Sequence, residues 1–333
     1  MPKPSVLLTR EIPLSGMELL QEKCDLVIWE KDSVASREWL LEHMAYADGV
    51  LCLLTDSIDT EVLNAGKSLH VVSTMAVGYD NIHVAECTKR GIPVGHTPGI
   101  LTETTADFAF ALLLTAARRI VEGDSYVKQG HWQSWSPTVL LGRDLHGATL
   151  GIVGCGRIGR AVAKRAKGFG MRILACRSSS QPHGKEEKDT DIEYVDFATL
   201  LAESDFVSLH VPLTKETRHL IGHAELHRMK NTAILINTAR GPVVDSQALS
   251  HALSHGEIAY AALDVTDPEP LPCDDSLLSL SNCVIVPHIA SASIATRGKM
   301  AVMAVKNLLA GLAGERLPYC ANPEVYESPP DLT

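Results

Sequence analysis

Three polar side chains in the C-terminal half of the chain stand just after apolar runs, where the strands of a sheet would end. Arg240 lies in the segment 237–241, Glu269 stands between two prolines, and His288 follows Pro287. A guanidinium, a carboxylate and an imidazole at neighbouring strand ends can hold a carboxylate and protonate a carbonyl group. This combination predicts the reduction of a 2-keto acid, provided that a hydride donor binds nearby.

Each of these three residues also has a structural interpretation. Glu269 could brace a loop, His288 could be a hydrogen-bonded histidine at a strand end, and Arg240 could form a structural ion pair. Their occurrence together with a cofactor motif favours catalysis over three unrelated structural roles. We interpret the other histidines, His210 among them, as structural or solvated.

The segment 149–159 predicts the cofactor site, because an apolar strand leads into a glycine turn and then into a helix. Gly154 permits the tight turn, Gly156 lets the backbone approach a pyrophosphate, and Gly159 lets helix and strand pack closely. The helix expected over 157–167 offers N–H groups and a partial positive charge to the phosphates at its N-terminus. The pattern therefore predicts a dinucleotide-binding site.

The end of the next expected strand, 171–176, bears on the form of the dinucleotide. A site for NAD usually has Asp or Glu about 20 residues past the turn, where it binds the ribose 2′-hydroxyl. Here Arg177 is followed by serines, and no carboxylate occurs before Glu186. Because an arginine beside hydroxyls suits a 2′-phosphate, Arg177, Ser178 and Ser179 predict NADP(H) in preference to NAD(H). The alternative is a solvated loop that accepts either cofactor.

Length and composition narrow the class of protein. The 333 residues suit two domains, and 45% hydrophobic with 21% charged residues is typical of a globular chain. A net charge of -10 argues against a nucleic-acid partner, since a phosphate backbone would repel an acidic surface. The chain has no apolar run long enough for a bilayer and no pair of cysteines spaced for zinc, and its first residues are not expected to act as a signal peptide. We therefore expect a cytoplasmic enzyme without a membrane or metal partner.

Short apolar runs alternate with stretches of helical period, which predicts an α/β fold built on parallel sheets. A first small domain is expected to contain strands at 6–8, 26–28, 50–54 and 70–73. A nearly continuous apolar helix over 104–117 would be buried between two domains or two subunits. The segment 123–146, with Trp132 and Trp135, is expected to be an extended arm or loop. A last helix is expected over 294–312.

The chain resembles the D-isomer-specific 2-hydroxyacid dehydrogenases over nearly its whole length. The features that carry the resemblance are, in this order, the glycine motif, 237–241, Asp264, Glu269 and 287–288. Within the family, the stretches similar to the glyoxylate/hydroxypyruvate reductases are 72–80, 101–106, 132–135, 263–272 and 307–312. The resemblance implies NADPH-dependent reduction of glyoxylate to glycolate and of hydroxypyruvate to D-glycerate. Another D-2-hydroxyacid dehydrogenase of different substrate preference, or a dinucleotide-sensing scaffold, is the alternative.

The resemblance also implies roles for single residues. His288 would protonate the carbonyl oxygen as hydride reaches C2, and Glu269 would pair with His288 and raise its pKa. Arg240 would hold the substrate carboxylate and polarise the carbonyl group. The backbone N–H groups of Val77 and Gly78 would bind the same carboxylate.

Further residues are implied in the two binding sites. Asp264 would orient the nicotinamide carboxamide, and Trp135 would reach a neighbouring subunit's active site and help select hydroxypyruvate, unless it only packs in a dimer. The substrate site is expected to contain Val77, Gly78, Trp135, Arg240, His288 and Ser291. The cofactor site is expected to contain Thr105, Gly154, Gly156, Arg157, Ile158, Gly159, Arg177, Ser178, Ser179, Val211, Pro212, Thr238, Ala239, Arg240, Asp264 and His288.

The family architecture implies two Rossmann-like, doubly wound parallel-sheet domains with the active site in the cleft between them. The catalytic domain would be discontinuous and comprise residues 1–98 and 288–333. The dinucleotide-binding domain would comprise residues 99–287, including a dimerisation helix and arm at about 102–146. Closure over the substrate would exclude water from the hydride path, and the chain is expected to form a homodimer.

Overall fold

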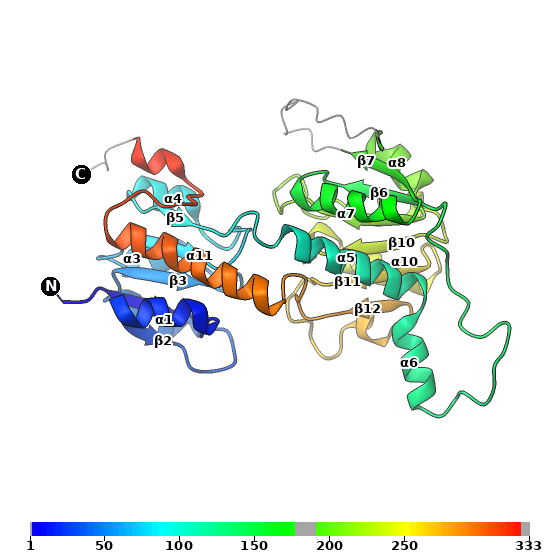
Figure 1. The fold of residues 1–333 in the computed structure, drawn as a ribbon, viewed down its shortest axis with the longest axis horizontal. Helices are drawn as coiled ribbons and strands as arrows, with labels where there is room; N and C mark the ends of the chain where they lie inside the picture. The colour runs from blue at the N-terminus through cyan, green and yellow to red at the C-terminus, as the bar shows by residue number, and fades with distance from the viewer. Residues whose placement is uncertain (1, 177–190, 328–333) are drawn as a thin grey trace. The chain divides into compact units, whose positions relative to one another are not determined.

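The computed structural model describes residues 2–176 and 191–327. The chain divides into two compact units: unit 1 is Met1–Leu101 with Ala292–Thr333, and unit 2 is Thr102–Ser291 (Figure 1). His288 therefore belongs to unit 2, together with Arg240 and Glu269. Among the described residues, no helix combines the length and the apolarity that a membrane crossing requires.

Unit 1 contains a five-stranded parallel sheet in the order β2-β1-β3-β4-β5. Its strands are β1 (Ser5–Leu8), β2 (Asp25–Ile28), β3 (Gly49–Cys52), β4 (Val71–Thr74) and β5 (Val94–Gly95). Its helices are α1 (Leu14–Lys23), α2 (Arg37–Met44), α3 (Thr60–Ala65), α4 (Val84–Lys89) and α11 (Ile294–Leu312), followed by a 3-10 turn, η3 (Pro323–Tyr326). The four strands expected in this part of the sequence and the last helix are confirmed.

The two faces of this sheet have separate hydrophobic cores. The helices α1 and α11 supply one core, which includes Leu20 and Leu308, and α2 and α3 supply the other, which includes Leu40 and Leu63. Because both faces are covered, β1, β3, β4 and β5 are buried almost throughout, as expected of a parallel sheet, whereas the edge strand β2 is partly exposed. Unit 1 is thus a complete α/β unit assembled from both ends of the chain.

Unit 2 contains a seven-stranded parallel sheet in the order β12-β11-β10-β9-β6-β7-β8. Its strands are β6 (Thr149–Val153), β7 (Arg172–Cys176), β8 (Ile192–Tyr194), β9 (Phe206–Leu209), β10 (Ile234–Asn237), β11 (Tyr260–Leu263) and β12 (Cys283–Ile285). Its helices are α5 (Thr102–Ala117), α6 (Ile120–Lys128), α7 (Arg157–Gly168), α8 (Phe197–Glu203), α9 (His223–Arg228) and α10 (Ser246–Ser254), with 3-10 turns η1 (Gly241–Val243) and η2 (Ser276–Ser279). The strand order reverses between β6 and β9, which is the Rossmann arrangement.

The apolar helix α5 lies inside unit 2. It packs against α7 and against β10 and β11, and its buried side chains, including Phe110 and Leu113, belong to the core on that face (Figure 1). Helices α8, α9 and α10 cover the opposite face. The predicted fold class, with two Rossmann-like α/β units, is confirmed.

One expected irregular segment is partly helical. The segment 123–146 was expected to be an arm or loop, but its first residues belong to α6. Local ion pairs support this helix, because Lys128 contacts Asp124 one turn earlier at 2.7 Å. Residues 129–148 then contain neither helix nor strand.

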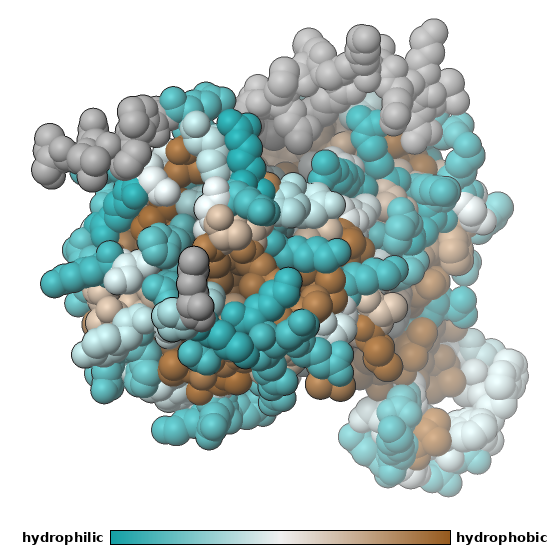
Figure 2. Space-filling model, turned by 60° about the vertical axis from the view of Figure 1, so that its left-hand side comes forward, coloured by the Kyte–Doolittle hydropathy of each residue, from teal (hydrophilic) through white to brown (hydrophobic). Residues whose placement is uncertain are grey.

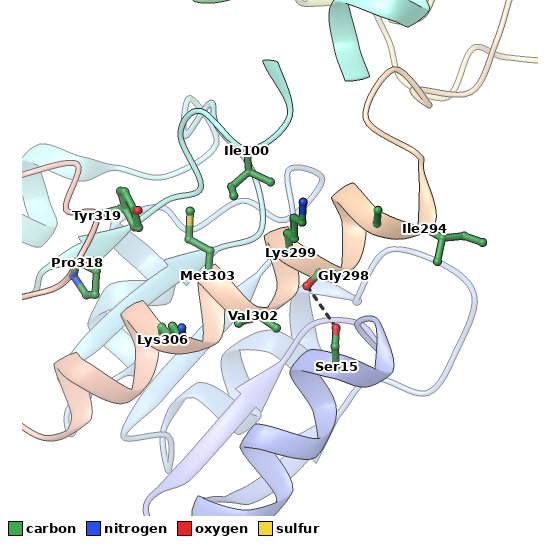
Figure 3. A pocket seen from close by; sticks show the side chains of 11 residues that line it. Ser15, Ile100, Ile294, Gly298, Lys299, Val302, Met303, Lys306, Pro318 and Tyr319 are labelled. Atoms are coloured by element: carbon green, nitrogen blue, oxygen red, sulfur yellow. Dashed lines mark hydrogen bonds between the residues drawn. The ribbon is translucent and has the colours of Figure 1, made fainter. Parts of the chain in front are cut away.

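A groove of about 830 Å³ runs along α11 in unit 1 (Figure 3). Its lining is mostly apolar, with Ile100, Val302 and Met303, and two lysines at positions 299 and 306 provide its charge. Figure 2, which brings unit 1 forward, shows such brown apolar residues among teal polar ones. The groove contains none of the residues predicted to bind substrate or cofactor, so we place the candidate active site elsewhere.

Candidate active site

The glycine turn after β6 has the close contacts that its motif predicts. Gly154 has φ of 94°, and a Cβ added there would lie 2.8 Å from the His210 carbonyl group. A Cβ added at Gly159 would lie 2.3 Å from the Gly154 oxygen, whereas one added at Gly156 would meet nothing within 4 Å. The first and third glycines therefore permit packing inside the protein, and the second leaves open space above the backbone.

Helix α7 begins directly at this open space. Gly156 is its N-cap residue and supplies no side-chain cap, so the first N–H groups of the helix have no side-chain oxygen of their own. An anion placed there would meet backbone donors and the positive end of the helix. This arrangement fits the pyrophosphate of a dinucleotide.

The strand β9 ends beside the same turn. His210 N donates to the Val153 oxygen at 2.8 Å, and Val211 Cγ1 lies 2.8 Å from the position of a Cβ on Gly154. His210 Nε2 is 2.8 Å from Ser208 Oγ, and burial lowers the pKa of His210 to about 4. The imidazole is therefore neutral at physiological pH and acts as a hydrogen-bonded structural group.

The turn after β10 positions Arg240. The buried Asn237 accepts a hydrogen bond from Ala239 N at 3.0 Å and donates to the Arg240 oxygen at 2.9 Å. Thr238 Oγ1 is buried and has no hydrogen-bond partner within the described part of the chain. The sequence motif contains Asn237, but its role as the amide that fixes this turn depends on contacts that the motif does not reveal.

The loops after β10 and β11 touch. A Cβ added at Gly241 would lie 1.8 Å from the Thr266 oxygen, so only glycine permits this approach. Ser246 Oγ further donates to the Asp267 oxygen at 3.1 Å. The loop that contains Arg240 and the loop that leads to Glu269 are therefore held against each other.

Glu269 and His288 form a direct pair. His288 Nδ1 lies 2.6 Å from Glu269 Oε1, and Thr266 N donates to the other carboxylate oxygen at 3.4 Å. Both side chains are partly exposed, so they are accessible to a small molecule. The pairing that the family resemblance implied is present in the structure.

Asp264, directly after β11, binds the chain around His288. It is 1% exposed, and its two carboxylate oxygens accept hydrogen bonds from Ile289 N at 2.6 Å and Ala290 N at 2.9 Å. Burial raises the pKa of this carboxyl group. These backbone contacts were not part of the expectation for Asp264, which concerned only the nicotinamide.

Most of the predicted cofactor residues lie at one edge of the unit 2 sheet. They stand where parallel strands end, which is where ligands bind in open α/β sheets. The residues at these strand ends are Gly154 and Gly156 after β6, Val211 and Pro212 after β9, Thr238, Ala239 and Arg240 after β10, Asp264 after β11 and His288 after β12. Arg157, Ile158 and Gly159 begin α7, and Thr105 is buried in α5.

The remaining predicted residues are more scattered. Val77 and Gly78 follow β4 in unit 1, where His96 Nδ1 lies 3.0 Å from the Val77 oxygen. In unit 2, Ser291 is buried, and Trp135 is 79% exposed in the segment after α6. Arg177, Ser178 and Ser179 lie outside the described residues. Within the described ranges, no three His, Cys, Asp or Glu side chains are grouped so that they could hold a metal ion.

Comparison with known proteins decides the family. The NAD-binding domain of the D-isomer-specific 2-hydroxyacid dehydrogenases matches residues 110–290. The chain belongs to this family. It is therefore an NAD(P)-dependent oxidoreductase that acts on the CH–OH group of 2-hydroxy acids.

Individual members of the family are similar over nearly the whole chain. Glyoxylate reductase of Korarchaeum cryptofilum is 54% identical, and the match covers 98% of each chain. A crystal structure of a Thermus thermophilus protein is 45% identical with a TM-score of 0.88, covering 95% of this chain and 99% of that one. An NADPH-dependent glyoxylate/hydroxypyruvate reductase of Sinorhizobium meliloti, in complex with NADP and malonate, is 31% identical with a TM-score of 0.83, covering 96% and 97%.

The glycine turn gives a test of dinucleotide binding. Gly159→Ala forces a Cβ against the Gly154 oxygen, so we expect the Kd for NADPH and NADH to rise at least tenfold, or about 1.4 kcal/mol. Gly168→Ala, at the end of the same helix, meets nothing within 4 Å and should leave both Kd values unchanged. Fluorescence titration measures them. Equal affinity in the Gly159 variant and the wild type would contradict this account of the turn.

Proposed function

We propose that this enzyme reduces glyoxylate to glycolate and hydroxypyruvate to D-glycerate, with NADPH as the hydride donor. The observation that carries the proposal is the His288–Glu269 pair, with Nδ1 and Oε1 2.6 Å apart, on the unit that also has the dinucleotide turn. The choice of substrates is supported by relatives named glyoxylate reductase and by the similar Sinorhizobium meliloti enzyme named for glyoxylate and hydroxypyruvate.

In the proposed reaction, His288 donates the proton. Glu269 engages Nδ1 and stabilises the imidazolium, so the proton leaves from Nε2 and reaches the carbonyl oxygen of the substrate. A bound nicotinamide supplies the hydride that C2 accepts. The carbonyl group becomes an alcohol, and the neutral imidazole takes a new proton from water.

The other site residues bind and orient the acid. Arg240 holds the substrate carboxylate with its fixed fork of donors and polarises the carbonyl oxygen. The backbone N–H groups of Val77 and Gly78 are proposed to bind the same carboxylate, and Ser291 to contact the substrate. The 2-keto acid is thereby fixed by its carboxylate, and the group on C3 is left to set the preference among substrates.

The reaction and the role of His288 can be tested together. We expect NADPH oxidation to be faster with glyoxylate and hydroxypyruvate than with pyruvate or phosphohydroxypyruvate. His288→Ala removes the proton donor and should lower kcat about 10²–10⁴-fold with little change in the Kd for NADPH. His227→Ala, a substitution of an exposed histidine on α9, is the matched control and should keep wild-type kcat.

Two results would count against this function. Absence of turnover with all four acids would leave a dinucleotide-sensing scaffold as the better description. Loss of NADPH binding in His288→Ala, alongside the loss of kcat, would point to a structural role for His288.

The preference for NADPH is proposed from Arg177 and the serines after it. An arginine bound to a 2′-phosphate forms charge-assisted hydrogen bonds of about 1.5–3 kcal/mol, so Arg177→Ala should raise the KM for NADPH about 10–100-fold. The KM for NADH should change little. Arg172→Ala, which removes an exposed arginine paired with Glu193 and Glu203, is the control. Faster wild-type turnover with NADH than with NADPH would overturn the preference.

We propose that the chain forms a homodimer through α6 and the segment that follows it. Large apolar side chains are exposed there in one continuous part of the chain, which is typical of an interaction surface. They are Ile120, Val121, Val127, Trp132, Trp135, Val139 and Leu141. In such a dimer, Trp135 is proposed to reach the partner's substrate and favour hydroxypyruvate.

Charged substitutions test this surface. Val127→Asp with Leu141→Asp should halve the mass seen by light scattering, because two unpaired carboxylates would be buried at the interface. Leu278→Asp changes a similarly exposed leucine elsewhere in unit 2 and should leave the mass unchanged. Trp135→Ala should raise the KM for hydroxypyruvate more than that for glyoxylate. A wild-type mass of one chain would refute the dimer.

A further inference from the structure

The backbone at His288 has an unusual conformation. Its φ is 52°, in the left-handed region that residues other than glycine rarely adopt and that costs about 1–2 kcal/mol. His288 N donates to the Asp264 oxygen at 2.9 Å and to the Val286 oxygen at 3.0 Å. This backbone conformation sets the direction of the Cα–Cβ bond of His288. The contacts that hold the backbone therefore also point the imidazole toward Glu269.

Asp264 binds the chain on both sides of this residue. Its carbonyl oxygen accepts from His288 N, and its carboxylate oxygens accept from Ile289 N at 2.6 Å and from Ala290 N at 2.9 Å. Three consecutive backbone N–H groups therefore end on one residue. A turn tied at three successive positions has little freedom to relax to a negative φ.

Asp264 is itself fixed to the neighbouring strand. Asp264 N donates to the Asn237 oxygen at 2.9 Å, and the Asn237 side chain binds the turn that contains Arg240. Asp264 is 1% exposed, so water does not compete for its carboxylate. The hydrogen bonds between Asp264 and the turn at His288 are thus anchored in the same sheet that positions Arg240.

We propose that Asp264 is the positioning residue for His288, because its carboxylate fixes the turn that aligns the imidazole with Glu269. This inference rests on the proposed function, in which His288 donates the proton. It is separate from an interaction between Asp264 and the nicotinamide, since each carboxylate oxygen can accept a second hydrogen bond.

The proposal requires two acceptor oxygens at this position. Asn would keep one oxygen and place an NH₂ group against a backbone N–H, so one of the two buried bonds would be lost. Asp264→Asn changes charge and hydrogen bonding with almost no change of volume. Asp264→Ala removes both acceptors and leaves the N–H groups of Ile289 and Ala290 without them.

The chain offers a matched control for this substitution. The Asp245 carboxylate also accepts from two backbone N–H groups, those of Gln247 and Ala248, both at 3.0 Å, at the start of α10. Both of these N–H groups end on the same oxygen, Oδ1, so Asp245→Asn can keep the contacts through its amide oxygen and removes only the charge, at a site that has no part in the proposed reaction. We expect a smaller fall in Tm for Asp245→Asn than for Asp264→Asn, because only the Asp264 carboxylate uses both of its oxygens on backbone N–H groups.

Activity should separate the two variants. Asp264→Asn should lower kcat for glyoxylate about 100-fold, within the range of general acid catalysis, while the Kd for NADPH changes less than about threefold. The solvent deuterium isotope effect on kcat should rise, because proton transfer becomes slower. Asp245→Asn should keep wild-type kcat. Wild-type kcat in Asp264→Asn would overturn the proposal.

A second measurement does not depend on turnover. The Nδ1 proton shared by His288 and Glu269 should give a low-field NMR resonance in the protein without substrate, identified by its loss in Glu269→Gln. Asp264→Asn and Asp264→Ala should shift or remove it, and Asp245→Asn should not.

An unchanged resonance, with loss of NADPH affinity, would mean that Asp264 acts only on the cofactor. If the wild type reduced none of the acids, the proposed function would fail. The effect of the Asp264 variants on this resonance would still show whether Asp264 positions His288.

Discussion

The hydrogen bond between His288 and Glu269 depends on the order of three parallel strands. Asn237 of β10 pairs with Leu263 of β11, and Leu263 pairs with Ile285 of β12, so the three strands end at the same edge. Polar residues that follow these ends along the chain are thereby collected in space. A guanidinium, a carboxylate and an imidazole from separate loops need no long or flexible connection to act on one small acid.

The same edge also contains the dinucleotide turn. The order of strands reverses between β6 and β9, and the glycine turn follows β6 at that point. A ligand that binds where the order reverses can extend along the neighbouring strand ends, those of β10, β11 and β12. Unit 2 can therefore hold a dinucleotide and the proposed proton donor, His288, at the ends of strands of one sheet. Val77 and Gly78 of unit 1 are proposed to offer backbone N–H groups to the substrate.

The sequence predicts those parts of the site that depend on local pattern. Apolar runs give the strands, the glycine spacing gives the turn at Gly154, and the residue types after each run indicate the chemistry. The contacts of Asp264 with Ile289 and Ala290 join residues 25 and 26 positions apart and depend on register and on the conformation of a turn. Helix α6 was missed for a different reason: its ion pairs, such as Lys128 with Asp124, are local, but the helix has no buried residue and therefore no apolar face that would indicate it.

Some polar side chains of the site form hydrogen bonds with the protein's own backbone, and others can form them with a ligand. Asn237 and Asp264 use their polar atoms on backbone partners, so they set geometry. Thr238 Oγ1, on the residue that follows Asn237, is buried without a partner among the residues that the structure describes, at a cost of about 1–3 kcal/mol. A ligand that bonds to this hydroxyl recovers that free energy. Because Thr238 shares its turn with Arg240, dinucleotide binding at this position would stabilise the loop that is proposed to hold the substrate carboxylate.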